Sequence, residues 1–184
     1  MVAIRPGAPA SRIRFSHLIR ADRRGVTAVE FGFIVMPLMA LLVATLQIAT
    51  TMFTQQALET VAEKGARLLL TGQPQKAGMS AATFRNAMCS TLPGYMKCNN
   101  LMIDVAVASD FSSAVTTTPT ITYDSSGKPN NSWSYNAGNP GDIIVLRTMY
   151  VWDVQKGPLG FDIANLTANR RLLMATSVFR AENY

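Results

Sequence analysis

The chain has 184 residues, a formal net charge of +6 and 48% hydrophobic residues. Residues 1–24 form a leader with a charge of +5, from six arginines and one acid: Arg5, Arg12, Arg14, Arg20, Arg23, Arg24 and Asp22. The rest of the chain has 11 basic and 10 acidic residues, a charge of +1. Because the excess charge is confined to this leader, the composition favours the cytosolic flank of a membrane anchor over a nucleic-acid-binding surface, and no nucleic-acid partner is expected.

The stretch after the leader is long, uncharged and strongly apolar from residue 31 to residue 58. About 20 apolar helical residues cross a bilayer, so we predict a transmembrane helix over residues 26–53. The arginines before it predict a cytoplasmic N-terminus and an extracytoplasmic region from residue 54 onwards. No Ala-x-Ala site lies between Ala40 and Ala62, so cleavage by an ordinary signal peptidase after the helix is not expected.

Beyond the membrane, the helical pattern continues to about residue 71. Leu58, Val61 and Leu69 lie on one apolar stripe of this segment, which is typical of an amphipathic helix packed on a domain. Glycine and proline at residues 72–74 predict its end. A second, short helix is expected over residues 80–88, with Ser80 as its N-cap.

The two cysteines, Cys89 and Cys98, both follow the predicted transmembrane helix. An oxidising compartment beyond the membrane favours a disulfide between them, with buried unpaired thiols as the alternative. A bridge closing so short a loop contributes about 2–3 kcal/mol on the chain-entropy model. Two cysteines with no histidine nearby cannot complete a zinc site, so no metal is expected.

The second half of the chain contains a series of strand patterns without helices between them. Residues 101–109 and 143–154 are the clearest, residues 116–123 and 133–135 are weaker, and residues 171–180 form the last. Consecutive strands without crossover helices predict an antiparallel sheet. We therefore expect an α+β fold in which a long N-terminal transmembrane and amphipathic helix packs on a small antiparallel β-sheet head.

No catalytic constellation stands out in this sequence. The one histidine, His17, lies in the leader, so the head lacks the residue most often used as a general base or a metal ligand. The aspartates are scattered, and there is no glycine-rich phosphate loop. We expect a protein that binds or assembles, with no catalytic residues, no enzyme activity and no cofactor.

Glu30 is the one acid at the start of the apolar run, where a carboxylate is costly to bury. It could lie solvated at the cytoplasmic interface without a role. It could also interact favourably with the helix dipole, which is compatible with the other interpretations. In the third interpretation the chain is cut after Gly25, and the new amine of Val26 pairs with the Glu30 of a neighbouring helix in a bundle.

Several short motifs carry a resemblance to a known family. Gly25 and the following Val26-Thr27-Ala28-Val29-Glu30-Phe31 resemble the processing region of type IV prepilins. Together with Pro37, residues 55–58 and residues 65–67, this stretch is similar to the TadE-like family of tight-adherence (Flp, type IVc) pilus proteins. Residues 150–152 and 175–184 also resemble the end of that family, whereas residues 80–138 show no match.

This resemblance implies a minor pilin or pseudopilin needed for pilus assembly and surface adherence. A prepilin peptidase would remove the basic leader, residues 1–25, by cutting between Gly25 and Val26, while Glu30 and Phe31 would serve processing and assembly. Residues 26–53 would form the transmembrane helix and residues 54–184 the extracytoplasmic head. The implied partners are that peptidase, other Tad pilins or pseudopilins that contact the N-terminal helix, and the Tad inner-membrane assembly machinery.

The implied location is the bacterial inner membrane, with the head in the periplasm and, after assembly, on the pilus or cell surface. A head of this size suits a tip, initiating or accessory subunit better than the repeating one. Two alternatives stay open. The chain could be an uncleaved bitopic scaffold of the Tad secretion machine, or a secreted enzyme with an unusual anchor, against which the lack of histidine in the head argues.

Overall fold

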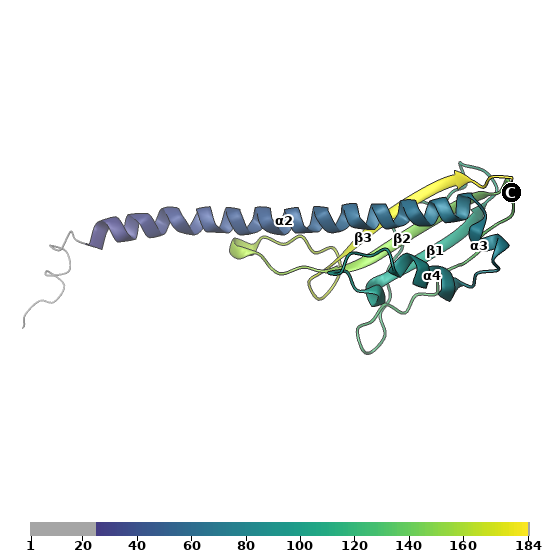
Figure 1. The fold of residues 1–184 in the computed structure, drawn as a ribbon. Helices are drawn as coiled ribbons and strands as arrows, with labels where there is room; N and C mark the ends of the chain where they lie inside the picture. The colour runs from purple at the N-terminus through teal and green to yellow at the C-terminus, as the bar shows by residue number, and fades with distance from the viewer. Residues whose placement is uncertain (1–24, 184) are drawn as a thin grey trace, which may run out of the picture. The chain divides into compact units, whose positions relative to one another are not determined.

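The computed structural model describes residues 25–183, so the basic leader over residues 1–24 lies outside the described residues. One long helix, α2, runs from Val26 to Leu70 (Figure 1). It passes through two compact units of the chain, the first ending at Leu42 and the second beginning at Val43. The second unit contains the sheet and the short helices. This architecture confirms the α+β prediction of a long helix and a small antiparallel sheet.

The sheet has three antiparallel strands in the order β1-β2-β3, which is also their order in the chain. These strands are β1 (Leu101–Ala108), β2 (Ile143–Asp153) and β3 (Arg170–Arg180). Leu101 lies opposite Tyr150 in the first pair of strands, and Ile143 lies opposite Arg180 in the second. The strands rich in β-branched residues thus form where the sequence predicts them, within a residue or two at each end.

Helix α2 covers one face of this sheet with its C-terminal half (Figure 1). Its buried residues follow the helical period and include residues of the predicted apolar stripe: Thr51, Thr54, Leu58, Val61, Ala62, Gly65 and Leu69. A Cβ built on Gly65 would lie 2.5 Å from the terminal atoms of Met88 and 3.3 Å from Leu146. Glycine therefore allows α2 to approach the sheet and the helix that carries Met88 closely at this point.

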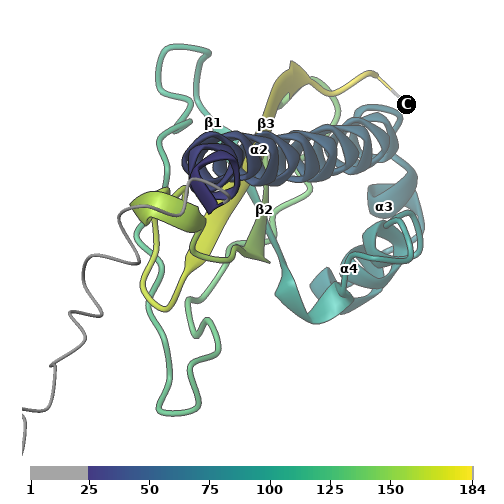
Figure 2. The same ribbon diagram turned by 90° about the vertical axis from the view of Figure 1, so that its left-hand side faces the viewer.

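Two short helices follow α2 in the chain, and Figure 2 shows both beside it. Helix α3 (Gln73–Lys76) was not predicted; it begins after Gly72, which adopts a left-handed conformation with φ of 69°. Helix α4 (Ala81–Cys89) begins at the predicted N-cap, because the Ser80 hydroxyl accepts a hydrogen bond of 3.2 Å from the Thr83 amide. Phe84 and Met88 of α4 then join the main core.

The other face of the sheet is also covered, which the strand patterns did not predict. Met102, Met149, Val151 and Leu172 form a second buried cluster with Ile121, a residue of the long β1–β2 connection. Figure 2 shows this connection on the opposite side of the sheet from α3 and α4. Residues 101–105 of β1 are therefore covered on both faces, whereas Val107 is 38% exposed.

Two predicted strands are wrong. Residues 116–123 form no strand, and only Tyr123 makes an isolated bridge, to Pro129. Residues 133–135 likewise contribute one bridge, between Tyr135 and Val105. Proline at position 119 lacks the amide that a strand interior needs. Residues 116–123 instead lie over the second face of the sheet, where Ile121 is buried, whereas residues 134–136 hydrogen-bond the edge of β1 at Val105.

Candidate functional site: the N-terminal part of helix α2

The predicted processing residues lie at the start of α2. Gly25 directly precedes the helix, Val26 is its first residue, and Glu30 follows Val26 by one turn. Four residues of α-helix rise about 6 Å and return to nearly the same face, so Val26 and Glu30 are neighbours on one side of the helix. All three residues are exposed, as is Phe31.

Nothing in the described structure requires glycine at position 25. A Cβ built there would meet no atom within 4 Å, and Gly25 is not among the glycines with positive φ. At Gly65, by contrast, a Cβ would contact Met88. No contact within the described part of the chain therefore explains the glycine at position 25.

Glu30 is the one ionisable side chain of α2 before Glu59. Within residues 25–183 the single salt bridge joins Arg147 to Asp104, so Glu30 has no ion-pair partner among the described residues. Its neighbours along the helix are apolar except for Thr27. A carboxylate in such surroundings needs water, a helix N-terminus or a cation once the helix is covered by lipid or by other helices.

The rest of this segment exposes large apolar side chains on all sides of the helix. Phe31 is 65% exposed, Phe33 is 73% exposed, and the set continues along the helix: Ile34, Met36, Leu38, Met39, Leu41, Leu42 and Leu46. None of the most apolar part of α2 is buried within the protein. Such a surface needs an apolar cover, and α2 is long and apolar enough to cross a membrane.

Pro37 lies inside α2 without ending it. Proline has no amide proton, so the carbonyl of Phe33, four residues earlier, loses its usual partner in the helix. Membrane helices tolerate this because neighbouring helices or polar side chains can satisfy the free carbonyl. Helix α2 continues on both sides of Pro37.

The head holds the second predicted pair. A disulfide joins Cys89, the last residue of α4, to Cys98, the first residue of the 3-10 helix η2 (Cys98–Asn100). Arg85 supports this loop from α4 by donating to the carbonyls of Cys98 at 2.6 Å and Leu101 at 3.2 Å. The bridge thus fixes the connection between α4 and β1. It confirms the disulfide that the expected oxidising compartment favoured.

Sequence reasoning missed one feature of the head, a buried ion pair between neighbouring strands. Asp104 is 4% exposed, and its carboxylate accepts hydrogen bonds from the guanidinium of Arg147 and from the Ser134 amide. The two charged residues lie opposite each other in the β1–β2 register. The sequence did contain a signal for this pair: an aspartate inside one predicted strand and an arginine inside another.

The described residues contain no group of three or more histidine, cysteine or carboxylate side chains that could hold a metal ion. Gly25, Val26, Glu30 and Phe31 form one group at the helix start, and the disulfide belongs to the head. The exposed apolar surface of α2 is consistent with a membrane-anchored chain.

Comparison with known proteins supports this interpretation of the helix. Residues 25–67 match the family model described as TadE-like protein. The match begins at Gly25 and ends near the C-terminus of α2, so it covers the predicted processing residues, the apolar segment and most of the helix that packs on the sheet. No curated protein and no solved structure matches the chain.

Proposed function

We propose that this chain, whose residues 25–67 match the TadE-like family, is a minor pilin or pseudopilin of a Tad (Flp, type IVc) pilus. A prepilin peptidase cuts it between Gly25 and Val26 on the cytoplasmic side of the inner membrane. The processed subunit then enters a pilus through its N-terminal helix and supports surface adherence. In this scheme residues 1–25 are the leader, residues 26–53 the membrane helix and residues 54–184 the periplasmic head.

One observation carries the proposal: a carboxylate with no ion-pair partner among the described residues, Glu30, lies one turn from the predicted new N-terminus. Cleavage after Gly25 converts the Val26 nitrogen into an ammonium group, the cation that Glu30 lacks among the described residues. In the low dielectric of a helix bundle, an unpaired carboxylate is strongly disfavoured, whereas a hydrogen-bonded charge pair is held firmly. Pairing between neighbouring subunits would therefore fix the axial register of each helix.

Gly25 supports the cleavage step of this proposal. A protease must bind the residues around the bond that it cuts in an extended form, and a glycine without local contacts suits that requirement. The exposed apolar surface of residues 26–42 supports the proposed assembly, because this surface needs lipid before assembly and other pilin helices afterwards. The proposed partners are thus the peptidase, other Tad pilins or pseudopilins, and the Tad inner-membrane assembly machinery.

An alternative keeps the same topology without cleavage. In this second proposal the chain is a bitopic scaffold of the Tad secretion machine, and the basic leader stays in the cytosol. Neither proposal assigns the chain an enzymatic activity. The alternative gives Glu30 no amine to pair with, and it leaves the glycine at position 25 without a reason.

The experiment that tests the proposal is replacement of Glu30 in cells that assemble pili. Glu30→Ala should leave cleavage intact but reduce the amount of head domain recovered in sheared surface filaments, because the amine of Val26 loses its partner. Glu63→Ala is the matched control, since Glu63 is also an exposed glutamate of α2 but follows the apolar run. Normal filaments in the Glu30→Ala strain would remove the assigned role of this residue.

A further inference from the structure

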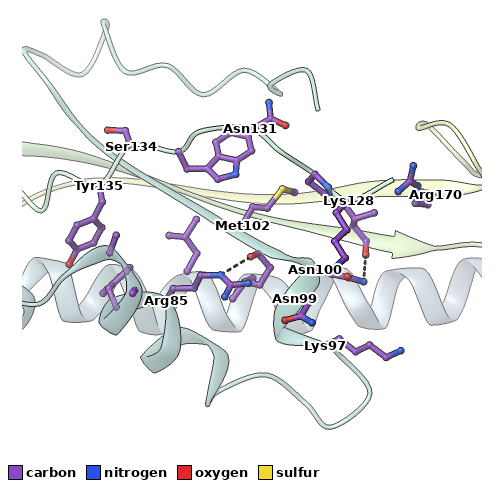
Figure 3. Close-up of a pocket in the computed structure, with 18 of the residues that line it drawn as sticks. Arg85, Lys97, Asn99, Asn100, Met102, Lys128, Asn131, Ser134, Tyr135 and Arg170 are labelled. Carbon is purple, nitrogen blue, oxygen red and sulfur yellow. Dashed lines mark hydrogen bonds between the residues drawn. The ribbon is translucent and has the colours of Figure 1, made fainter. Parts of the chain in front are cut away.

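A trough of about 770 Å³ lies on the head at the outer edge of β1 (Figure 3). One wall comes from α4 and the segment that leads from the disulfide into β1, and it includes Arg85, Lys97 and Asn99. The other comes from the β1–β2 connection, which contributes Lys128, Asn131, Trp133 and Tyr135. The trough belongs entirely to the head and is separate from the helix start discussed above.

Positive charge predominates around this trough. Four cations and one carboxylate line it: Arg85, Lys97, Lys128, Arg170 and Asp153. None of the four cations forms a salt bridge within residues 25–183. Arg170 lies opposite Asp153 in the β2–β3 register, yet its guanidinium donates to the carbonyls of Gly127 and Thr167. The trough therefore presents cations that no acid of the described chain neutralises, which favours an anionic ligand.

The edge of β1 has one open position in the trough. The Val105 amide donates to the Ser134 carbonyl, and the Val105 carbonyl accepts from the Asn136 amide, so alternate residues of β1 direct their backbone away from β2. The Leu101 carbonyl on the same edge accepts from Arg85. Between them, the Ile103 amide and carbonyl have no partner among the described residues. One donor and one acceptor are too few for the addition of a peptide strand.

The trough also contains apolar and neutral polar groups. Trp133 and Tyr135 are half-buried: Trp133 packs against the second cluster, and the Tyr135 ring lies 5.5 Å from that of Phe84. Asn99 and Asn100 add amide groups from η2, although the Asn100 amide nitrogen already donates to the Val151 carbonyl. Flat aromatic surface beside amides and cations is suited to a ligand with an apolar face, many hydroxyl groups and regular negative charge.

We propose that this trough binds a segment of an acidic polysaccharide. The sugar rings of such a polymer carry carboxylates, and each ring has hydroxyl groups at its edge and apolar C–H groups on its faces. Lys97 and Lys128 contact the carboxylates, the Ile103 backbone bonds hydroxyl groups, and Trp133 packs on a ring face. An acidic peptide fits less well, because the open strand edge offers one residue only. This activity of the head goes beyond the proposed role of α2 in assembly and does not depend on cleavage.

The test measures binding of a galacturonic-acid hexamer to the full chain in detergent, by titration calorimetry. The fully methyl-esterified hexamer removes the charge but keeps the sugar rings, and hexaglutamate keeps the charge without them. The Lys97→Glu/Lys128→Glu double variant should bind the hexamer about tenfold more weakly or worse. Lys64→Glu/Lys156→Glu is the matched control, because both lysines are exposed and lie outside the trough.

Tryptophan fluorescence provides a second measurement, since the chain has two tryptophans. Binding should change the emission of the Trp152→Phe variant and leave that of Trp133→Phe nearly unchanged. The proposal is overturned if the hexamer does not bind, if the esterified hexamer binds equally well, or if the double variant binds like its control. Equal or tighter binding of hexaglutamate would also overturn it and indicate a site for acidic peptides.

Discussion

The buried pair of Asp104 and Arg147 makes the sharpest prediction about the stability of the head. Asp104 lies on β1 with an exposed fraction of 4%, and one carboxylate oxygen accepts from the Arg147 guanidinium at 2.7 and 3.0 Å. The other oxygen accepts from the Ser134 amide at 2.8 Å. This carboxylate therefore ties together both strands and the connection that covers the second face of the sheet.

Asp104→Asn removes the charge but keeps the size of the side chain. Loss of one partner of a buried pair costs about 3–5 kcal/mol, because the remaining charge is left uncompensated. The Arg147 side chain is 16% exposed and keeps some contact with water, so we expect a smaller loss of about 2–3 kcal/mol in the free energy of unfolding. For a chain of this size, that loss lowers the melting temperature by about 4–12 °C.

Circular dichroism of the full chain in detergent, followed during thermal unfolding, measures this effect. Asp153→Asn is the control, because Asp153 is also a strand aspartate but is exposed and has no salt bridge among the described residues. Adding Arg147→Met to Asp104→Asn should recover part of the loss, since no buried charge then remains unpaired. A melting temperature for Asp104→Asn equal to that of the control would refute the reasoning.

Three further predictions concern the head. Replacement of Cys89 and Cys98 by alanine should lower the free energy of unfolding by about 2–3 kcal/mol in denaturant titrations, and an unchanged midpoint would show that the loop is held by its other contacts. Leu58→Ala, at a fully buried site, should cost about 2–5 kcal/mol, whereas Leu46→Ala, 65% exposed, should barely change unfolding of the head. Burial raises the pKa of the Tyr150 phenol above its ordinary value of 10.0, so the folded head disfavours the ionised form and should lose stability as the pH rises above about 10. Tyr150→Phe should weaken that dependence on pH, and an unchanged alkaline transition would assign it to another group.

The sequence was sufficient to predict the elements whose signal is local. The uncharged run and the stripe through Leu58 and Leu69 predicted α2, and β-branched alternation predicted β1 and β2. Ser80 marked the start of α4 because an N-cap side chain bonds an amide only a few residues away. Each of these signals depends on neighbours in the chain or on a simple period.

The features that the sequence did not predict depend on contacts between distant segments. The threonine-rich stretch at residues 116–123 has strand propensity, but no neighbouring strand is available to pair with it, and packing of Ile121 on the second face decides its conformation. The Asp104–Arg147 pair could not be predicted without the β1–β2 register. The trough likewise combines α4, the edge of β1 and a connection about 30 residues further along the chain.

The mass of the intact protein extracted from bacterial membranes is the most direct test of the account. A chain that begins at Val26, with an amine one turn from the carboxylate of Glu30, is the predicted result. A chain that still begins at Met1 and is nevertheless present in assembled filaments would contradict it.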